Sequence, residues 1–539
     1  MGLATIDIVV IAIYAVFIFG LAQFVSREKG GKAKDSSDYF LASKSLPWWA
    51  IGASLIAANI SAEQIIGMSG SGYAIGLAIA SYEWMAALTL LIVGKYFLPV
   101  FLKNRIYTMP QFLEQRYGTR IRTLMALFWL ALYVFVNLTS VLWLGSLAVT
   151  TVTGVDQTTA MFAIAAFSLL YQLYGGLKAV ALTDIVQVTL LVLGGIMISV
   201  ITLNEVGGDA GFVGGFMRLT EELPDKFDMI LSADNPFYKD LPGISVLIGG
   251  MWIANLAYWG FNQYIIQRAL AAKSVEEAQK GIVFAAFLKL LVPFIVVVPG
   301  IAAVILAPDL ERPDQAYPMM MNLLPAGILG LVFAALIAAV VGTLASMINS
   351  IGTIFTLDLY AKFTGRHSLA EDNEADGTAP SQKTPEGEKH LVLVGRITAV
   401  VAITIAALTA RPLLGGSDQA FQFIQEFSGF FTPGITVIFL LGLFWKKASE
   451  AGALGAAVAS VALSYLFKAF TPTLPFIDRM GLVFLAALAI AIVLSLAMPA
   501  AAGKDRVSTT GISYKTTSGF NIAAIAVIAI LVAFYTAWW

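Results

Sequence analysis

The feature that most constrains this chain is an apolar run at residues 45–76, which is long enough to cross a bilayer but carries Asn59, Ser61, Glu63 and Gln64 near its middle. Inside a bilayer, each unsatisfied polar group costs several kcal/mol. The cluster therefore predicts a broken helix that lines a wet or ligand-filled cavity, as at the midplane site of secondary transporters. The alternative is a kinked span whose polar side chains bond neighbouring helices.

The composition indicates a polytopic membrane protein. Of 539 residues, 58% are hydrophobic and 12% are charged, against roughly 25% charged in soluble domains. Cysteine is absent, and His367 and His390 both lie in one polar loop. No HExxH, Walker A or GxSxG pattern occurs, so we expect neither an enzyme nor an ATP-driven pump, and no organic cofactor. The net charge of -1 gives no indication of nucleic-acid binding.

Counting apolar runs of about 20 residues predicts fourteen membrane-spanning helices. The first lacks a basic leader and is too long for a signal peptide, so it is kept as a span. The expected spans are 5–25, 47–68, 76–101, 123–147, 159–174, 180–203, 244–266, 282–306, 326–358, 391–410, 420–444, 451–467, 482–498 and 522–538.

The basic residues agree with this count. If both termini are external, the cytoplasmic loops hold 24 of the 33 Lys and Arg residues, the external loops hold seven, and Lys95 and Lys289 lie inside spans. Cytoplasmic loops are expected to carry that excess. The external loop 204–243 is acidic and contains three prolines, which predicts an ordered cap with short helices. The cytoplasmic loop 362–389 is polar and predicted to be disordered.

The polar spans also predict an inverted repeat. Five helices are an odd number, so two consecutive five-helix units would have opposite orientations in the membrane. The opening helix of each unit is polar in its middle, at Asn59 in the first unit and at Asn255 and Asn262 in the second. The expected organisation is an N-terminal helix and loop (1–46), a first repeat (47–204), an external loop (205–243), a second repeat (244–444, with a cytoplasmic loop at 362–390) and C-terminal peripheral helices (445–539).

Several motifs resemble the sodium/solute symporter family, in particular its bacterial sugar-transporting members. They are PWWAIGASLIAANISAEQIIGMSGSGYAIGLAIASYEW, YGGLKAVALTDIVQV, YWGFNQYIIQRALAAKSVEEAQKGIVFAAFLK and QAFQFIQE, and the likeness extends over nearly the whole chain. It implies an all-α membrane protein with the leucine-transporter-type fold, a ten-helix core of two inverted five-helix repeats within fourteen spans. It also implies alternating access, with one sugar moved per sodium ion.

The resemblance also implies which residues contact the sugar: Gln64, Glu83, Asn255, Lys289 and Gln425. Each has a structural alternative. Gln64 could satisfy backbone freed by the break, and Glu83 could be a protonated carboxyl that bonds a neighbouring helix. Lys289 could instead be the ion-pair partner of Glu83 or of another acid.

Aromatic positions match the gates of the family. Tyr258 corresponds to the inner gate, which stacks on the pyranose ring, and Met68, Tyr82 and Phe421 correspond to the outer gate. Aromatic faces suit the C–H faces of sugars, although aromatic side chains in spans also serve simply as packing.

The sodium site implied by the resemblance lies between the second and ninth spans. Its carbonyls map to Ala57, Ile60 and Ala339, and its hydroxyl pair maps to Gly342 and Thr343, so one oxygen is missing. We therefore expect sodium to bind more weakly than is usual in the family, unless water or Ser346 substitutes.

Two further positions bear on the transport cycle. Asp184 matches an acidic position on the proposed sodium exit route, with capping as its alternative, and a family serine in the sugar pocket is Ala86 here. Losing that donor leaves the choice between galactose and glucose open.

The sequence thus predicts a sodium-driven hexose symporter in the cytoplasmic (inner) membrane of a bacterium, with sodium, sugar and membrane lipid as its partners. A sodium-uncoupled sugar facilitator or sensor is one alternative. A symporter for another polar solute, such as an inositol, a sialic acid or a carboxylate, is the other, although Glu83 disfavours anions. The oligomeric state is left open.

Overall fold

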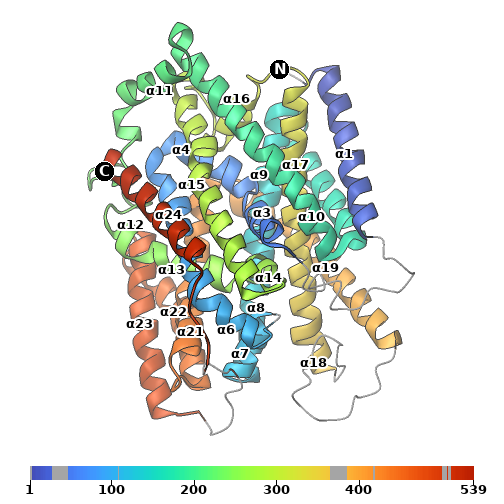
Figure 1. Ribbon diagram of the computed structural model, residues 1–539, viewed down its shortest axis with the longest axis vertical. Coiled ribbons are helices and arrows are strands. Elements are labelled where there is room, and N and C mark those ends of the chain that lie inside the picture. Colours follow the sequence, from blue (N-terminus) through green and yellow to red (C-terminus); the bar gives the residue numbers. More distant parts are fainter. Residues whose placement is uncertain are drawn as a thin grey trace.

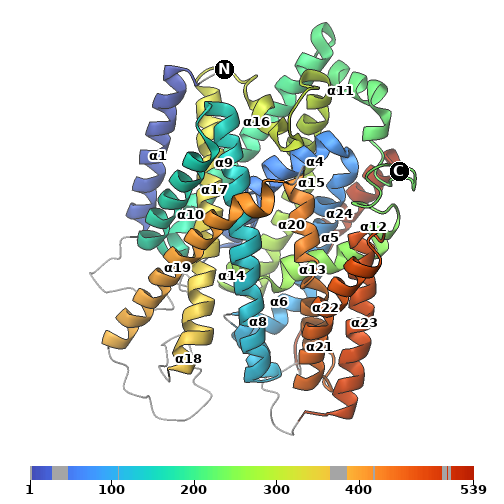
Figure 2. The same cartoon turned by 180° about the vertical axis from the view of Figure 1, so that it is seen from behind.

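The computed structural model describes residues 3–26, 46–106, 108–364, 385–416, 419–500, 507 and 511–539. Within these ranges the regular structure is helical apart from one bridge between Leu46 and Ala272. Figures 1 and 2 show an elongated bundle in which most helices run roughly along the long axis, with the N-terminus at one end.

The helices of the first part of the chain surround the break that the sequence predicted. They are α1 (Thr5–Ser26), α3 (Trp48–Asn59), η2 (Glu63–Gly67), α4 (Met68–Ala74), η3 (Leu77–Ala80), α5 (Ser81–Ile92), η4 (Val93–Phe97), α6 (Leu98–Lys103), α7 (Met109–Arg116), α8 (Thr119–Leu132), η5 (Tyr133–Leu138), α9 (Thr139–Thr153), α10 (Gln157–Gly207), η6 (Gly208–Ala210), α11 (Gly211–Glu222) and η7 (Pro224–Lys226).

The second part begins after the loop that follows η7. Its helices are α12 (Ser245–Ile248), α13 (Gly250–Phe261), α14 (Gln263–Leu270), α15 (Val275–Leu306), η8 (Pro313–Gln315), α16 (Ala316–Met321), α17 (Ile328–Thr353), η9 (Ile354–Tyr360), α18 (Ala361–Phe363), α19 (Pro385–Leu414), α20 (Ala420–Ser428), α21 (Thr432–Phe444), α22 (Glu450–Phe470), α23 (Phe476–Ala497) and α24 (Ser518–Ala537).

The described residues contain nine helices long and apolar enough to cross a membrane, or eleven when each bent pair is counted as one span. The other three expected spans do not meet this criterion, each for a different reason. The apolar part of α1 is short, at Thr5–Ile18. The expected span 244–266 is divided at Asn262 into α13 and α14. The expected span 159–174 lies within α10, in one continuous helix with the expected span 180–203.

Helix α10 has 51 residues. A straight helix of this length would measure roughly 77 Å, more than twice a hydrocarbon core of about 30 Å. Its second half belongs to a stretch, Ile185–Glu222, that qualifies as a span, and in Figure 1 the green C-terminal part of α10 runs diagonally upward to α11. The length of α10 is therefore sufficient for the two spans that the sequence predicted there.

The predicted break in the second span is present. Helix α3 ends at Asn59, and the helix that resumes at Glu63 is bent by 60° from it. Ile60 has a ψ of 81°, far from the helical value, and the amide of Ser61 donates to the carbonyl of Asn59 over 2.8 Å. In a continuous helix that amide would bond to the carbonyl of Ala57. The break therefore releases a backbone oxygen in the middle of the bundle.

A further bend, which the sequence did not predict, separates α20 from α21. The two helices pass the span criterion together and are bent by 47°. The bend lies at residues 428–432, beside Gly429 and just before Pro433. A proline at the start of a helix has no amide to donate, so a new helix begins there easily.

The external loop 204–243 contains the short helices α11 and η7, as its sequence predicted. Lys226 Nζ donates to the carbonyls of Ala74, over 2.5 Å, and of Tyr73, over 3.1 Å, at the end of α4. Gly76 follows with a φ of +108°, and a Cβ there would lie 2.3 Å from the carbonyl oxygen of Lys226. Only glycine fits this approach of the loop to the broken span.

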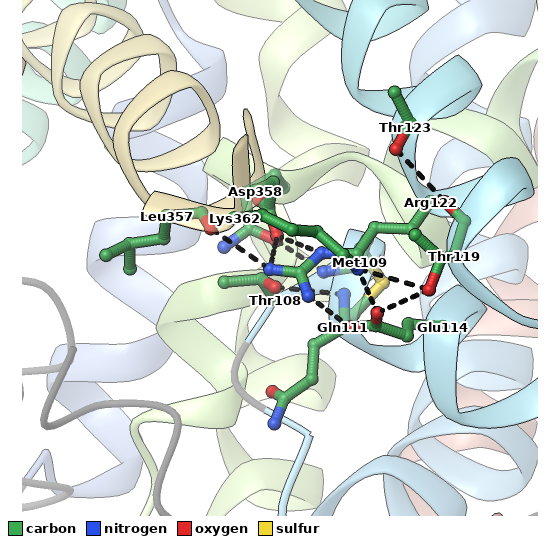
Figure 3. A network of polar contacts seen from close by, with 11 residues as sticks. Thr108, Met109, Gln111, Glu114, Thr119, Arg122, Thr123, Leu357, Asp358 and Lys362 are labelled. Atoms are coloured by element: carbon green, nitrogen blue, oxygen red, sulfur yellow. Dashed lines mark hydrogen bonds and ion pairs between the residues drawn. The ribbon is translucent and has the colours of Figure 1, made fainter. Parts of the chain in front are cut away.

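A charged cluster lies where α7, α8 and η9 meet (Figure 3). Arg122 bonds Asp358 over 2.8 Å and also pairs with Glu114, which pairs in turn with Lys362. Burial opposes ionisation of Glu114, but Arg122 and Lys362 hold its pKa below the usual value. The cluster joins the loop helix α7 to the end of the long helix α17–η9. Most of the predicted disordered loop 362–389 lies outside the described residues.

Candidate substrate pocket and cation site

A pocket lies between the helix breaks, where α3–η2, α5, η5, α13 and α20–α21 meet. Most side chains that the sequence associated with sugar binding or gating line it. They are Gln64, Tyr82, Glu83, Asn255, Tyr258, Phe421 and Gln425. These residues come from both predicted repeats and converge on one cavity.

Lys289 lies behind the pocket wall and not among the residues that line it. Its ammonium group is fully buried and contacts the carboxylate of Glu83 and the Oδ1 of Asn59. It also lies 4.8 Å from the ring centroid of Trp259, in a cation–π arrangement. The alternative interpretation of Lys289, as the partner of Glu83, therefore matches this structure. Through this pair Glu83 carries a compensated charge into the pocket.

The amides supply the neutral polar groups of the pocket. Gln64 is nearly buried, and its Oε1 has no hydrogen-bond partner among the residues that the structure describes. The Nδ2 of Asn255 donates to the carbonyl of Met251 over 3.1 Å, so one of its two N–H groups is used within α13. Both amide oxygens can accept from ligand hydroxyls. Ala86 also lines the pocket, so the missing serine removes a hydroxyl from the lining itself.

Two of the three predicted outer-gate residues touch each other. The rings of Tyr82 and Phe421 pack edge to face, with centroids 5.2 Å apart and an interplanar angle of 89°. Met68 is fully buried but is not part of the pocket lining. The residue before it, Gly67, lets Phe421 pack closely against η2, because a Cβ on Gly67 would lie 3.1 Å from the Cβ of Phe421.

Tyr258 is held at the other end by a small hydroxyl network. Its Oη accepts from the Nδ2 of Asn59 over 3.1 Å and lies 2.9 Å from the Oη of Tyr264. Nearby, Tyr133 donates to the Oδ1 of Asn262 over 2.6 Å, and Asn262 is the residue that interrupts α13 and α14. The polar groups at this end of the pocket therefore also connect the two broken helices.

Several pocket residues were given no role from the sequence. They include Asn59, Glu63, Trp129, Tyr133, Asn137 and Asn262. Asn59 and Glu63 belong to the polar cluster of the second span, and Asn262 is one of the polar residues in the opening helix of the second repeat. Asn137 is the one side-chain amide within the apolar run 123–147, and together with Thr139 and Ser140 it is the signal that could have assigned the fourth span to the pocket.

The residues expected to bind sodium lie on α3 and α17, which pack together. Ala57 lies in the last turn of α3 and Ile60 directly follows its end, and the carbonyl of Ala57 has lost its usual helical donor at the break. On α17, Ala339 and Thr343 are buried, and the Oγ1 of Thr343 has no hydrogen-bond partner within the described part of the chain. A freed carbonyl and an unpartnered hydroxyl are groups that suit a hard cation. The donor set fits sodium, although Gly342 supplies no side-chain oxygen.

Ser346 is the side chain that the sequence offers as a substitute for the missing hydroxyl. Its Oγ donates to the carbonyl of Gly342 over 2.9 Å and accepts from Arg268 over 3.0 Å. A cation placed on Ser346 would meet the guanidinium group of Arg268, which disfavours this substitution. Asp184, the predicted exit residue, lies in α10, and its side chain is outside the described residues.

The fold and this pocket define a class of protein, a secondary transporter built around broken helices. A solved sodium-coupled sialic acid symporter in a substrate-bound outward-open state shares the fold, with a TM-score of 0.77 at 22% identity over 92% of this chain and 99% of the other. A nucleobase-cation-symport-1 transporter in a closed conformation aligns with a TM-score of 0.52 at 15% identity, over 88% of this chain and 98% of the other. The fold is of the leucine-transporter type.

Residues 39–459 match the sodium:solute symporter family, and the chain belongs to that family. It is 50% identical to a sodium/glucose cotransporter of Vibrio parahaemolyticus, over 100% of this chain and 99% of the relative. It is 32% identical to the sodium/myo-inositol cotransporter 2 of Oryctolagus cuniculus, over 85% of this chain and 69% of the relative. It is 30% identical to the sodium/glucose cotransporter 1 of Ovis aries, over 84% and 69%.

Proposed function

We propose that this protein is a secondary active transporter that couples inward sodium movement to the uptake of a hexose, galactose or glucose, by alternating access. The observation that carries the proposal is the convergence of Gln64, Glu83, Asn255 and Gln425 on one pocket beside the break of α3. The full-length identity with a sodium/glucose cotransporter supports the same substrate class.

The roles of the pocket residues follow from their chemistry. Glu83, charged and paired with Lys289, accepts hydrogen bonds from sugar hydroxyls, and such bonds to a charged group are stronger than neutral ones. Gln64, Asn255 and Gln425 orient the remaining hydroxyls. Lys289 acts through Glu83, because its ammonium group is already occupied. Tyr258 closes the inner side by stacking on the ring, and Tyr82, Phe421 and Met68 close the outer side.

Sodium is the coupling ion in this proposal and binds between α3 and α17. The ligands are the carbonyls of Ala57, Ile60 and Ala339 and the hydroxyl of Thr343, with backbone or water at Gly342. Sodium fixes the break in the conformation that presents Gln64 outward. An ion can drive the cycle only by binding one conformation better than another. Asp184 is proposed to assist the exit of sodium to the cytoplasm.

The proposed architecture is fourteen spans with both termini external, in the cytoplasmic membrane of a bacterium. Its core is a pair of inverted repeats at 47–204 and 244–444, each of which opens with a helix broken near its middle. The distribution of Lys and Arg in the loops supports this orientation. Besides sodium, no cofactor is needed, because the transport cycle makes and breaks no covalent bond.

A second candidate substrate is an inositol. Ala86 leaves the pocket without one hydroxyl donor, and curated relatives at 32% identity are named sodium/myo-inositol cotransporters. An inositol presents a ring of hydroxyls similar to that of a hexose but has no ring oxygen. A sodium-uncoupled facilitator is a third possibility, for which Gly342 is the motivating residue.

Uptake into proteoliposomes tests the proposal. Labelled galactose, glucose and myo-inositol are offered in turn, with sodium or with potassium outside. We expect sodium-dependent uptake of a hexose, abolished by Glu83→Ala and by Gln64→Ala while the purified variants remain folded. Inositol uptake without hexose uptake would reassign the substrate, and full uptake in both variants would place the site elsewhere.

A further inference from the structure

Glu63 is a second carboxyl group in the pocket, and the proposed symport cycle leaves it without a role. It follows the break of α3, lines the cavity and is only 6% exposed. Glu83 is compensated by Lys289, whereas Glu63 has no ion pair among the residues that the structure describes. A buried carboxylate without a cation is strongly disfavoured in a low-dielectric environment. Its protonation state must therefore be explained by its contacts.

The contacts of Ser140 bear on that state. The Oγ of Ser140 contacts the Oε1 of Glu63 and also lies 3.0 Å from the carbonyl oxygen of Asn137. A serine hydroxyl has one proton, so it can donate either to a Glu63 carboxylate or to the Asn137 carbonyl, but not to both. Burial without a cation disfavours the carboxylate. We therefore infer the second arrangement, in which Ser140 donates to Asn137 and a neutral Glu63 donates to Ser140.

We propose that Glu63 is a proton-binding site, occupied when sodium is absent, and that sodium binding expels this proton. The inference rests on the sodium site of the proposed function. Glu63 is the third residue after Ile60, so the two Cα atoms are at most roughly 11 Å apart. A cation at the break favours the ionised carboxylate, by an amount on the order of tenfold in affinity at an effective dielectric constant of 20.

The exchange balances in charge. The carboxyl O–H bond breaks, its electron pair stays on the carboxylate, and the proton passes through the pocket to water as one sodium ion arrives. The total charge at the break stays the same. The carboxylate also adds negative charge to a site that lacks the oxygen of a side chain at Gly342, so ionised Glu63 compensates in part for that loss.

Other titratable groups are carried by the elements around Glu63. Facing the pocket with it are Glu83, Tyr82, Tyr133, Tyr258 and, bonded to Tyr258, Tyr264. The elements packed against η2 add Tyr73 on α4, Lys289 on α15, Asp314 on η8, Tyr317 on α16 and Glu426 on α20. Helix α15 also carries Glu276, Glu277 and Lys280 in its first turns, where they pair with one another. Lys289 is the cation of this set that contacts a pocket carboxyl group, and its contacts with Glu83 and Asn59 leave Glu63 as the group whose charge changes.

Proton release on sodium binding tests the proposal directly. Purified full-length protein in weakly buffered potassium medium is titrated with sodium chloride while an indicator dye follows the pH, and binding of radioactive sodium is measured in parallel. We expect up to one proton released per sodium bound, falling to none at high pH. Glu63→Gln should bind sodium without releasing a proton and with an affinity that no longer depends on pH. The control Glu222→Gln, at an exposed carboxylate, should behave like the unaltered chain.

Sodium binding without proton release between about pH 5 and 9 in the unaltered chain would overturn this inference alone. Unchanged release in Glu63→Gln would also overturn it. Absence of sodium binding in the unaltered chain would overturn the proposed symport as well, so the two failures are distinguishable.

Ser140→Ala gives a second test that keeps the carboxyl group. A neutral Glu63 loses the acceptor of its proton in this variant, so the pH midpoint of proton release should move to lower pH. A move to higher pH would show that Ser140 donates to a carboxylate, and would overturn the assignment.

Discussion

The Nδ2 of Asn59 donates a hydrogen bond to the hydroxyl of Tyr258 over 3.1 Å, and this contact joins the broken helix α3 to α13 at one end of the pocket. The proposed inner-gate residue is therefore hydrogen-bonded to the residue at which α3 ends. A change in the break, such as sodium binding or release, therefore acts directly on Tyr258.

The first prediction concerns this contact. Tyr258→Phe keeps the ring but removes the hydrogen bonds to Asn59 and Tyr264, each worth about 1 kcal/mol net. We expect the inner side to open more often, by a factor between about 5 and 30. The chain has no cysteine, so a cysteine introduced at the pocket residue Ala254 reports opening through its rate of labelling from the cytoplasmic side.

Tyr73→Phe serves as the control for this experiment. Its hydroxyl donates to the carbonyl of Pro308 over 2.7 Å, near the far end of α4. In the Tyr73→Phe variant, the cysteine at position 254 should be labelled at the same rate as in the chain with tyrosine at position 73. Equal rates in Tyr258→Phe would instead show that the Asn59–Tyr258 contact does not hold the gate.

A second prediction follows from the pair of Glu83 and Lys289. Lys289→Met leaves a buried carboxylate without its cation, and breaking a buried pair costs about 3–5 kcal/mol. We expect a large fall in the midpoint of thermal unfolding and loss of sugar uptake. The double variant Glu83→Gln, Lys289→Met should regain much of the stability but none of the uptake. Equal stability of the single and double variants would contradict the pairing.

The third prediction concerns Gly342. Gly342→Ser supplies the hydroxyl that the sequence lacks, and we expect the sodium concentration for half-maximal uptake to fall about fivefold, as for one added ligand worth about 1 kcal/mol. Gly342→Ala controls for the added bulk and should show no such fall. Unchanged sodium dependence in the serine variant would mean that the site is complete without this oxygen.

The fourth prediction concerns Asp240 in the external loop. Burial, together with the nearby charge of Glu426, raises its pKa to about 6. A folded-state pKa above the unfolded value means that the folded protein binds more protons, so stability falls as pH rises between about 4 and 6 and stays lower above that range. Asp240→Asn should therefore raise the unfolding midpoint at neutral pH, with a gain that vanishes below about pH 4.

Asp209→Asn, at an exposed carboxylate of the same loop, is the matched control and should leave the unfolding midpoint unchanged across this range. A gain for Asp240→Asn that is the same at every pH would contradict the role of its ionisation.

The polar break of the second span could be predicted from the sequence because Asn59, Ser61, Glu63 and Gln64 violate a simple rule of membrane burial. The pocket residues could be predicted because their motifs match those of a family. The bend between α20 and α21 could not, since FSGFFTPG contains no charged or amide side chain, and its glycines and proline are compatible with a continuous span.

Contacts between distant residues were also beyond the sequence. Ser140 lies 77 positions after Glu63, and the Lys289–Glu83 pair spans 206 positions. Both depend on how helices pack and not on the pattern within any one helix. For the same reason the sequence suggested Ser346 as a substitute ligand, whereas the packing commits its hydroxyl to Gly342 and Arg268.

The most direct test of the central claim is the accumulation of labelled galactose in proteoliposomes after an inward sodium gradient is imposed. The account predicts an internal galactose concentration that rises above the external one, collapses when a sodium ionophore is added, and fails to rise in potassium. Equilibration to equal concentrations with or without sodium would contradict coupling and would make the protein a facilitator.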